Sequence, residues 1–558
     1  MIGSKTVFVY GLIVLALLGC GGGGPDPRGF ADIENDQNVG FSNVDFGSTT
    51  GTGSGASGGN TGGSTGVASD FAQGLFRSPG IYKNACSAPR GAPWPDRQGT
   101  RTDEKQWLRA WSHDTYLWYD EITDVDPSGP ENPLAYFELL KTNATTPSGA
   151  PRDQFHFTIP TAEFIDQSQT GTSAGYGLEL AFVENAPPRE LIVSSVVAGS
   201  PAAASGVFRR GTRILGVDGV DLVNGNDVAT LNAGLFPAAA GESHRFEISD
   251  FDGGNVQDVT LVSANVVFPP VPIVDVLNRG ADRVGYLVFN DHNEPSEAAL
   301  IDAVSTLAAG GVNELVLDLR YNGGGLLAIA NELAYMIAGP TSEGRVFEEL
   351  RFNDKYPTTD PVTGAVLVPA RFEPQAVGFS VAAGTTLPTL TLTRLVVLVG
   401  AGTCSASESI INGLRGIDFP VALIGEPTCG KPYGFYPTDN CGTTYFTIQF
   451  QGANEKGFGD YADGFLPTEA TPALPEEVPG CRVADDFSRE LGDAEENLLE
   501  TALAYLETGT CPNPPVSTLA VRPEARKGVG GAVQTTAAGG ERLVDLRQRP
   551  GRVVLRQP

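Results

Sequence analysis

The sequence predicts a multidomain α+β protein in which a helical unit and a β domain precede a larger α/β core. Aromatic residues recur at mixed helical spacing between positions 103 and 140, and short apolar runs alternate with Gly and Asp turns from 172 to 267. Beyond position 280, apolar runs of strand length alternate with helical patterns, which is typical of a parallel sheet covered by helices. A chain of 558 residues has room for two or three such domains.

The charge balance excludes one class of function. The chain has 37 Lys and Arg against 66 Asp and Glu, a formal net charge of −29. No stripe of basic residues interrupts this excess of acid, so no nucleic-acid partner is expected.

Residues 1–20 have the features of a secretory signal. Lys5 precedes an apolar run over 7–18 that is too short for a membrane-spanning anchor. The run ends in Leu-Leu-Gly-Cys, which resembles a lipobox and implies cleavage before Cys20 and lipidation of that cysteine. We therefore expect an exported bacterial lipoprotein on the periplasmic face of the envelope, where Gly21 favours the outer membrane.

Two segments are too poor in large apolar residues to build a core. Residues 21–75 are rich in Gly, Ser, Thr, Asn and Asp, and 513–558 carry Gly-Gly repeats and scattered Arg. We expect a flexible tether and a disordered tail, which leaves the folded part within 76–512.

Six cysteines remain after the predicted lipidation site, and an even number in an exported protein predicts up to three disulfides. They are Cys86, Cys404, Cys429, Cys441, Cys481 and Cys511. Fifteen pairings are open, among them Cys429 with Cys441 and Cys404 with either of these two. The sequence contains no Cys-x-x-Cys or His-rich spacing, so neither a metal nor another cofactor is predicted.

Residues 76–170 are expected to form the N-terminal helical region. Three of the four tryptophans fall between 107 and 118, and such clusters pack in a core more often than they line a groove. His113 lies among them, and we expect a structural histidine there.

Residues 171–268 resemble a PDZ domain. The resemblance rests on Gly175, Tyr176, Gly177 and Leu178, on Ser-Pro-Ala-Ala-Ala-Ser-Gly at 200–206, and on Gly-Thr-Arg-Ile-Leu-Gly-Val-Asp-Gly at 211–219. It implies that residues 175–178 offer backbone amides to a peptide carboxylate and that the peptide adds to the sheet edge. The alternative is a spacer that only gates another site.

The region 280–512 is predicted to be the α/β core. A strand over 286–290, a helix over 294–309 and a strand over 315–319 form a βαβ unit, and a helix is predicted over 326–338. Further strands are predicted over 395–400 and 421–425, separated by a helix that starts at Ala406.

Two polar residues follow these last two strands. Ser405 stands where a strand passes into a helix, and Lys431 follows the next strand. A neutral lysine can take the proton of an attacking serine, so the pair is a candidate Ser/Lys dyad. The competing interpretation is a capping box, in which Ser405 and Glu408 only satisfy free amides at the helix start.

Three segments together resemble the carboxyl-terminal processing peptidases, or tail-specific proteases. Residues 318–325 read Asp-Leu-Arg-Tyr-Asn-Gly-Gly-Gly, 403–408 read Thr-Cys-Ser-Ala-Ser-Glu, and 425–431 read Gly-Glu-Pro-Thr-Cys-Gly-Lys. The resemblance implies a crotonase/Clp-like core, Ser405 as nucleophile, Lys431 as base, and the amides of Gly324 and Ala406 as oxyanion donors. It also implies a serine endopeptidase acting on unstructured proteins or peptides with exposed C-terminal tails. Ser407 would be a structural neighbour, and Asp318 and Arg320 an ion pair.

One position departs from the family pattern. Many members carry Gln or Glu four residues after the lysine, whereas this chain has Phe435, so Asn440 or a backbone carbonyl would have to orient Lys431. Burial against Tyr433 and Phe435 would lower the pKa of Lys431 from about 10.4, as a base at neutral pH requires.

Two other functions stay open. A catalytically silent relative could bind protein tails as a scaffold. A Ser-His hydrolase could use His292 or His156 as its base.

Overall fold

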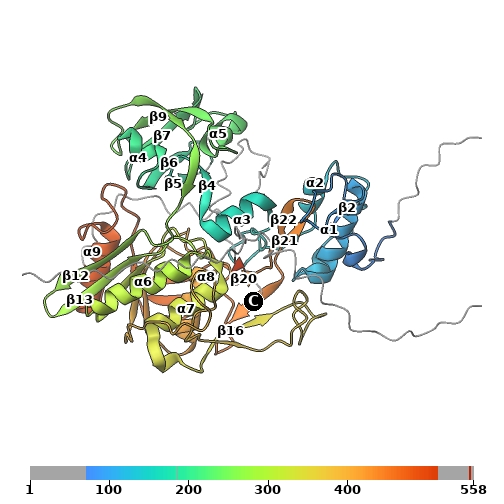
Figure 1. The fold of residues 1–558 in the computed structure, drawn as a ribbon. Helices are drawn as coiled ribbons and strands as arrows, with labels where there is room; N and C mark the ends of the chain where they lie inside the picture. The colour runs from blue at the N-terminus through green and yellow to red at the C-terminus, as the bar shows by residue number, and fades with distance from the viewer. Residues whose placement is uncertain (1–70, 185, 513–551, 554–558) are drawn as a thin grey trace, which may run out of the picture.

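The structure is a computed structural model that describes residues 71–184 and 186–512 and the backbone of 552–553. Figure 1 shows an N-terminal helical unit, a β domain above, and a larger core below. The predicted signal with Cys20 lies outside the described residues, as do nearly all of the tether and of the tail. None of the helices in the described part is long and apolar enough to span a bilayer.

The N-terminal unit is built around α1 (Arg101–Thr115), which begins at a capping box between Thr100 and Asp103. The tryptophans lie in the core as predicted: Trp107 and Trp111 stack at 5.0 Å and are buried. The other elements of this part of the chain are short. They are η3 (Pro79–Ile81), β1 (Ala85–Cys86), β2 (Arg97–Gln98), η4 (Tyr119–Glu121), α2 (Pro133–Phe137), β3 (Phe157–Pro160) and α3 (Thr161–Thr170).

The N-terminal unit is not separate from the core in space. Strand β3 pairs with β22 (Thr443–Phe446), which pairs in turn with β21 (Thr438–Asn440). A disulfide joins Cys86 to Cys441 in the turn between those two core strands. Residues almost 300 positions apart therefore share one small sheet, so the two ends of the folded chain stabilise each other.

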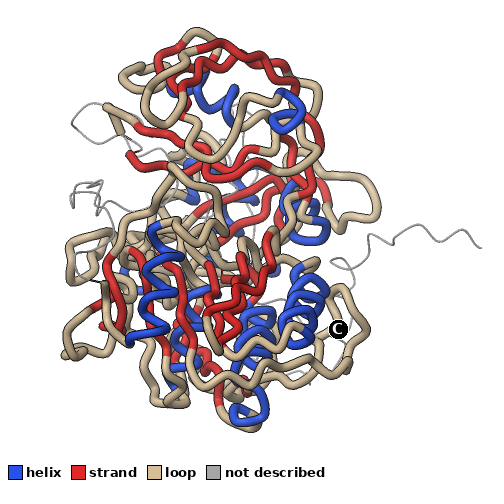
Figure 2. Tube along the Cα trace, turned by 90° about the vertical axis from the view of Figure 1, so that its left-hand side faces the viewer, coloured by secondary structure: helices blue, strands red, loops and turns tan. Residues whose placement is uncertain are grey.

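The β domain is a six-stranded sheet with its own hydrophobic core. Its strand order is β10-β9-β7-β6-β5, with β8 paired to β7, and Figure 2 shows the domain above the core. Its elements are β5 (Leu178–Glu184), β6 (Glu190–Val196), α4 (Pro201–Ser205), β7 (Arg213–Val217), β8 (Val220–Asp221), α5 (Val228–Leu235), β9 (Ser243–Ser249) and β10 (Gln257–Val262). Two more strands, β4 (Thr172–Gly175) and β11 (Ala264–Val267), form a separate antiparallel ladder where the chain enters and leaves the domain.

The core is organised on a seven-stranded sheet of order β12-β13-β14-β18-β19-β25-β24, parallel except for the first pair. Its strands are β12 (Ile273–Arg279), β13 (Asp282–Val288), β14 (Glu314–Asp318), β18 (Leu395–Val399), β19 (Val421–Gly425), β24 (Leu466–Thr468) and β25 (Glu477–Arg482). The strand predicted over 421–425 is confirmed, and that over 395–400 is one residue too long. Strand β13, which corresponds to the strand predicted over 286–290, begins four residues earlier than predicted, because its leading residues pair with β12.

Helices cover both faces of this sheet. One face carries α6 (Ser296–Ala309), α7 (Leu327–Ala338) and α8 (Ala406–Gly416), and the other carries α9 (Asn497–Thr508). Successive strand residues point to opposite faces, so Leu317 packs toward α6 and α7 whereas Val316 packs toward α9. Helix α6 begins two residues later than predicted, since Pro295 is its N-cap.

The remaining elements lie outside the seven-stranded sheet. A four-stranded sheet has the order β17 (Ala370–Arg371), β16 (Val346–Arg351), β23 (Phe450–Ala453), β20 (Tyr433–Gly434), and η5 (Gly339–Ser342) follows α7. Strand β15 (Gly325–Leu326) pairs with β26 (Arg552–Val553).

Candidate active site

The register of the central sheet brings the two predicted dyad residues to the same edge. Strands β18 and β19 run parallel, and Val399 pairs with Gly425 at their carboxyl ends. Ser405 lies six residues after Val399, and Lys431 lies six residues after Gly425. The two residues are therefore reached by loop segments of equal length that start side by side. Both residues are fully buried.

Ser405 has a backbone conformation that few side-chain-bearing residues adopt. Its φ is +60° and its ψ is −115°, at the point where the chain turns from β18 into α8. Among the described residues its Oγ atom has no hydrogen-bond partner. A strained turn that presents an unpaired hydroxyl suits a nucleophile.

Asn322 holds this turn in place. Its carbonyl oxygen accepts hydrogen bonds from the backbone N of Cys404 at 3.1 Å and from Oγ of Ser407 at 3.0 Å. Ser407 is thus the structural neighbour that the resemblance implied.

Glu408 connects the serine loop to the lysine loop. Its Oε2 atom accepts from the backbone N of Ser405 at 2.9 Å and of Lys431 at 2.8 Å. Its Oε1 atom accepts from Oγ1 of Thr428 at 2.6 Å and from the N of Gly430 at 2.9 Å. The capping box predicted for Ser405 and Glu408 is present at the start of α8, and the carboxylate of Glu408 also organises the lysine loop.

Burial shapes the chemistry of Lys431. Its Nζ lies 4.1 Å from the ring centroid of Phe435 and 4.8 Å from that of Phe155. Burial lowers the pKa of Lys431 well below its usual value, although the carboxylates of Asp153 and Glu408 pull the other way. The lowered pKa favours the neutral amine that a general base requires. Phe155 and Asp153 come from the N-terminal unit, and no local pattern in the sequence pointed to them.

The predicted oxyanion donors have different positions in the hydrogen-bond network. Three neighbouring backbone N–H groups already have acceptors. That of Cys404 donates to the carbonyl of Asn322, that of Ser405 to the carboxylate of Glu408, and that of Ser407 to the carbonyl of Cys404. Among the described residues no such partner is found for the N–H of Ala406. The N–H of Gly324 donates to Oδ1 of Asn322 at 2.9 Å, so it would have to leave that acceptor to bind an oxyanion.

Neither candidate histidine lies in hydrogen-bond contact with Ser405. His292 Nδ1 bonds to Oδ1 of Asn322 at 2.9 Å, and burial lowers its pKa to about 3. Both ring nitrogens of His156 are engaged, Nε2 with the Phe137 carbonyl and Nδ1 with Thr447. His156 is therefore engaged elsewhere, whereas Nε2 of His292 is buried without a hydrogen-bond partner among the described residues.

Comparisons with known proteins find three regions of similarity. Residues 283–437 match Peptidase family S41, residues 103–155 its N-terminal domain, and residues 166–232 a PDZ domain. The chain is thus similar to peptidase family S41 over residues 283–437. It also has a fold similar to that of a crystal structure from Bacteroides fragilis NCTC 9343 assigned to the S41 proteases, with a TM-score of 0.53 and 23% identity over 75% of this chain and 100% of that one.

Curated S41 relatives resemble part of the chain. Carboxyl-terminal-processing peptidase 2 of Arabidopsis thaliana is 27% identical over 268 residues, which are 47% of this chain and 46% of the relative. The carboxyl-terminal-processing protease of Picosynechococcus sp. PCC 7002 is 28% identical over 272 residues, or 47% of this chain and 56% of the relative. The chain thus spans about half the length of these relatives.

The motif that starts at Asp318 forms a buried ionic cluster. As predicted, Arg320 pairs with Asp318 at 2.9 Å; it also pairs with Glu496 and Asp485, each at 2.8 Å. Arg210 of the PDZ domain joins this cluster through Asp485 at 2.7 Å and through the hydroxyl of Tyr321 at 2.7 Å. The PDZ domain is therefore bonded to the loop that leads into Asn322 and Gly324.

Part of the predicted peptide loop of the PDZ domain is used internally. The carbonyls of Tyr176 and Gly177 accept from Ala202 and Val197, and Gly175 lies in β4, outside the six-stranded sheet. Leu178 begins β5, which is an edge strand that pairs only with β6 among the described residues. That edge is where a peptide strand could add.

Cys404 and Cys429 form a disulfide beside the dyad. The predicted link from Cys404 to one of its two neighbours is confirmed for Cys429, and the alternative of Cys429 with Cys441 is wrong. The third disulfide joins Cys481 to Cys511. Cys404, Cys429 and Glu408 lie close enough to hold a metal ion, but the two thiols are joined and the carboxylate already accepts four hydrogen bonds. This donor set does not suit a metal.

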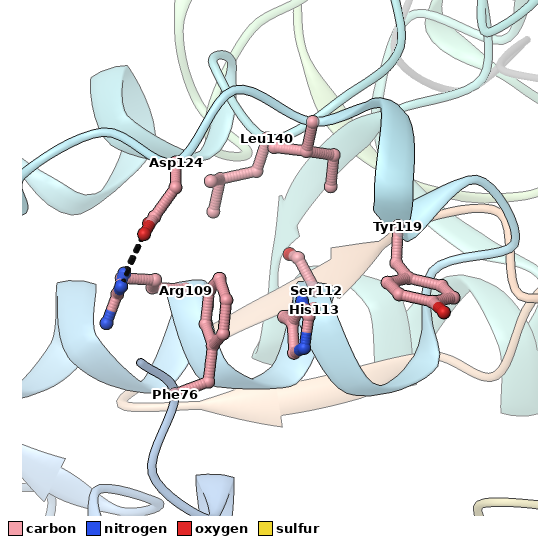
Figure 3. A pocket seen from close by; sticks show the side chains of 8 residues that line it. Phe76, Arg109, Ser112, His113, Tyr119, Asp124 and Leu140 are labelled. Carbon is pink, nitrogen blue, oxygen red and sulfur yellow. Dashed lines mark hydrogen bonds and ion pairs between the residues drawn. The ribbon is translucent and has the colours of Figure 1, made fainter. Parts of the chain in front are cut away.

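A small cavity lies away from the dyad, in the N-terminal unit (Figure 3). Its lining includes the ion pair of Arg109 with Asp124, and Phe76 stacked on His113 at 3.6 Å. Stacking on Phe76 agrees with the structural role predicted for His113.

Proposed function

We propose that the chain is a serine endopeptidase in which Ser405 is the nucleophile and Lys431 the general base. The observation that carries this proposal is the carboxylate of Glu408, whose single Oε2 atom binds the backbone of both residues. A lysine whose pKa is lowered by burial and a serine whose hydroxyl has no described partner complete the arrangement.

The reaction would follow the course of other acyl-transfer enzymes. Neutral Nζ of Lys431 accepts the proton of Ser405 as Oγ attacks the carbonyl carbon of the scissile bond. The N–H of Ala406, joined by that of Gly324, stabilises the negative oxygen. The C–N bond then breaks, the leaving amine takes the proton from Lys431, and water hydrolyses the acyl-enzyme by the same route.

The proposed substrates are unstructured proteins presented by their C-terminal tails. Relatives are named carboxyl-terminal-processing peptidases, and the open edge of β5 supports capture of an extended peptide. Because the dyad is fully buried, a folded domain could not reach it, and an extended strand could do so only after part of the surrounding structure has moved.

We further propose that the protein is a lipoprotein, attached to the periplasmic face of the envelope through Cys20 and sorted to the outer membrane. Three disulfides in the described residues support an oxidising compartment. Intact-mass analysis should find a diacylglycerol-modified Cys20 as the first residue. Cys20→Ala should move the protein to the soluble fraction, and unchanged membrane attachment of that variant would contradict the proposal.

The activity is tested with a disordered protein as substrate, using the chain from Phe71 and its Ser405→Ala and Lys431→Met variants. We expect hydrolysis that resists chelators and is lost in both variants while circular dichroism stays unchanged. Lys456→Met, at an exposed lysine paired with Asp418, is the matched control and should keep full activity. Activity that survives Lys431→Met would exclude the proposed base. Inertness of the parent chain, with tail peptides still binding, would favour a silent scaffold.

A further inference from the structure

The far C-terminal end of the chain returns to the proposed active site. Residues Arg552–Val553 form strand β26, which pairs in parallel with β15, Arg552 with Gly325 and Val553 with Leu326. Strand β26 also lies against β20, and in Figure 1 it is the short red arrow beside the β20 label.

Both neighbours of β26 belong to the catalytic loops. Strand β15 follows Gly324 directly, and Gly324 packs so closely on Ser405 that a Cβ atom there would lie 2.8 Å from the serine Cβ. Strand β20 begins two residues after Lys431. An extended backbone in this position lies between the loop of Gly324, which packs on Ser405, and the loop of Lys431.

Strand β15 has one edge already occupied. The N of Leu326 donates to the carbonyl of His292 at 2.8 Å, and His292 forms a parallel bridge with Gly325. Strand β26 is therefore the added strand of β15. Addition of an extended segment to an exposed strand is a general mode of peptide binding, because the main chain supplies the hydrogen bonds whatever the side chains are.

Chain length and sequence both permit this return. The disulfide of Cys511 with Cys481 anchors the end of the folded body, and 39 residues, 513–551, separate it from β26. Fully extended, they would reach about 130 Å, far more than the span of a domain of this size. Arg-Val-Val-Leu at 552–555 contains the β-branched and apolar residues that favour strands.

We propose that β15 is the strand to which a substrate adds, and that the C-terminal tail occupies it in cis as a competitor of other substrates. This inference rests on the proposed function, because it assigns the strand that binds the substrate at that same site. Ser405 and Lys431 have no exposed surface in the structure, and under this proposal a substrate strand binds at the site only after the tail has left β15.

The first test changes the tail and leaves the catalytic loops intact. Val553→Pro removes an N–H group and disfavours strand pairing at β26. A tethered segment has an effective concentration in the mM range, so if the free tail binds with a dissociation constant of about 0.1 mM, its detachment should raise kcat/KM about tenfold. Val533→Pro, the same substitution elsewhere in the tail, is the matched control and should leave kcat/KM unchanged.

The second test measures binding and does not depend on activity. A fluorescent peptide of residues 546–558 is added to a Ser405→Ala chain that ends at Pro515, which keeps every described element except β26. We expect saturable binding that the unlabelled peptide displaces and a scrambled peptide does not.

The outcomes separate this inference from the proposed function. Ser405-dependent hydrolysis that is equal in the parent, Val553→Pro and Val533→Pro chains, together with no peptide binding, would overturn the inference and leave the peptidase in place. Peptide binding in a protein without Ser405-dependent hydrolysis would retain the tail site and overturn the peptidase.

Discussion

The backbone N–H groups of Ser405 and Lys431 donate to the same atom, Oε2 of Glu408, at 2.9 Å and 2.8 Å. The two residues are 26 positions apart, and the disulfide between Cys404 and Cys429 joins the same two loops. The relative position of nucleophile and base thus depends on a third residue and on a covalent link, and neither of these takes part in proton transfer.

Glu408→Gln should therefore reduce activity although the side chains of Ser405 and Lys431 are unchanged. An amide nitrogen cannot accept a hydrogen bond, so two of the four donors that meet the carboxylate would lose their acceptor. We expect kcat to fall about 100-fold and the free energy of unfolding to fall by about 3 kcal/mol, because each buried unsatisfied donor costs about 1–3 kcal/mol. Steady-state kinetics and urea denaturation measure both. Glu507→Gln, at an exposed glutamate of α9, should change neither, and wild-type kcat in Glu408→Gln would refute the bridging role.

The pH dependence should report the protonation of Lys431. Activity should rise with pH through the lowered pKa of this amine, because only the neutral form accepts a proton. Asp153 raises that pKa, so Asp153→Asn should move the inflection of the kcat profile to lower pH. A shift to higher pH would mean that another group controls the rate.

The lowered pKa of Lys431 also predicts how the stability of the protein depends on pH. Folding lowers the pKa of Lys431, so the unfolded chain binds more protons between that value and the ordinary 10.5. The free energy of unfolding should consequently rise with pH in this window, by up to 1.4 kcal/mol per pH unit. Lys431→Met removes this contribution, so the variant should be more stable than the parent at neutral pH. Its advantage should shrink as the pH approaches 10.5, and a constant difference would argue against a buried titrating amine.

Gly324→Ala tests the contact beside the nucleophile. Gly324 has a φ of +98°, and a Cβ atom there would meet Ser405 Cβ at 2.8 Å and the N of Ala406 at 2.9 Å. Gly199→Ala carries a similar conformational cost at a φ of +76°, but its Cβ would meet nothing within 4 Å. We expect both variants to lose about 1 kcal/mol or more of stability, but only Gly324→Ala to lose activity, by 100-fold or more. Equal activities would place the oxyanion site elsewhere.

Arg210→Ala tests the bond between the PDZ domain and the core. Arg210 is buried and pairs with Asp485, whereas the adjacent Arg209 is exposed and pairs with Asp250 at the surface. Removal of a buried partner costs about 3 kcal/mol, and an exposed pair contributes less than about 1 kcal/mol. Thermal denaturation should therefore show a lower Tm for Arg210→Ala than for Arg209→Ala. Loss of the bond to Tyr321 should also lower kcat/KM, and similar behaviour of the two variants would contradict the link.

Elements and motifs with strong local signals were predictable. The continuous apolar runs of β18 and β19 determine two buried parallel strands, and Ser405 and Lys431 stand at equal distances beyond them. Motif positions such as Ser407 and the Asp318–Arg320 pair also have the roles expected of them. The choice among fifteen disulfide pairings was open, because pairing depends on which loops meet in space.

The sequence by itself determined the order of the units, the central strands and the candidate residues for the dyad, since hydrophobic periodicity and short motifs are local properties. Only the tertiary structure decided what surrounds the dyad. Phe155 beside Lys431, the pairing of β3 with β22, and the return of β26 to β15 join residues far apart in the chain. No local pattern encodes such contacts, because they form where separate surfaces happen to be complementary once the chain has folded.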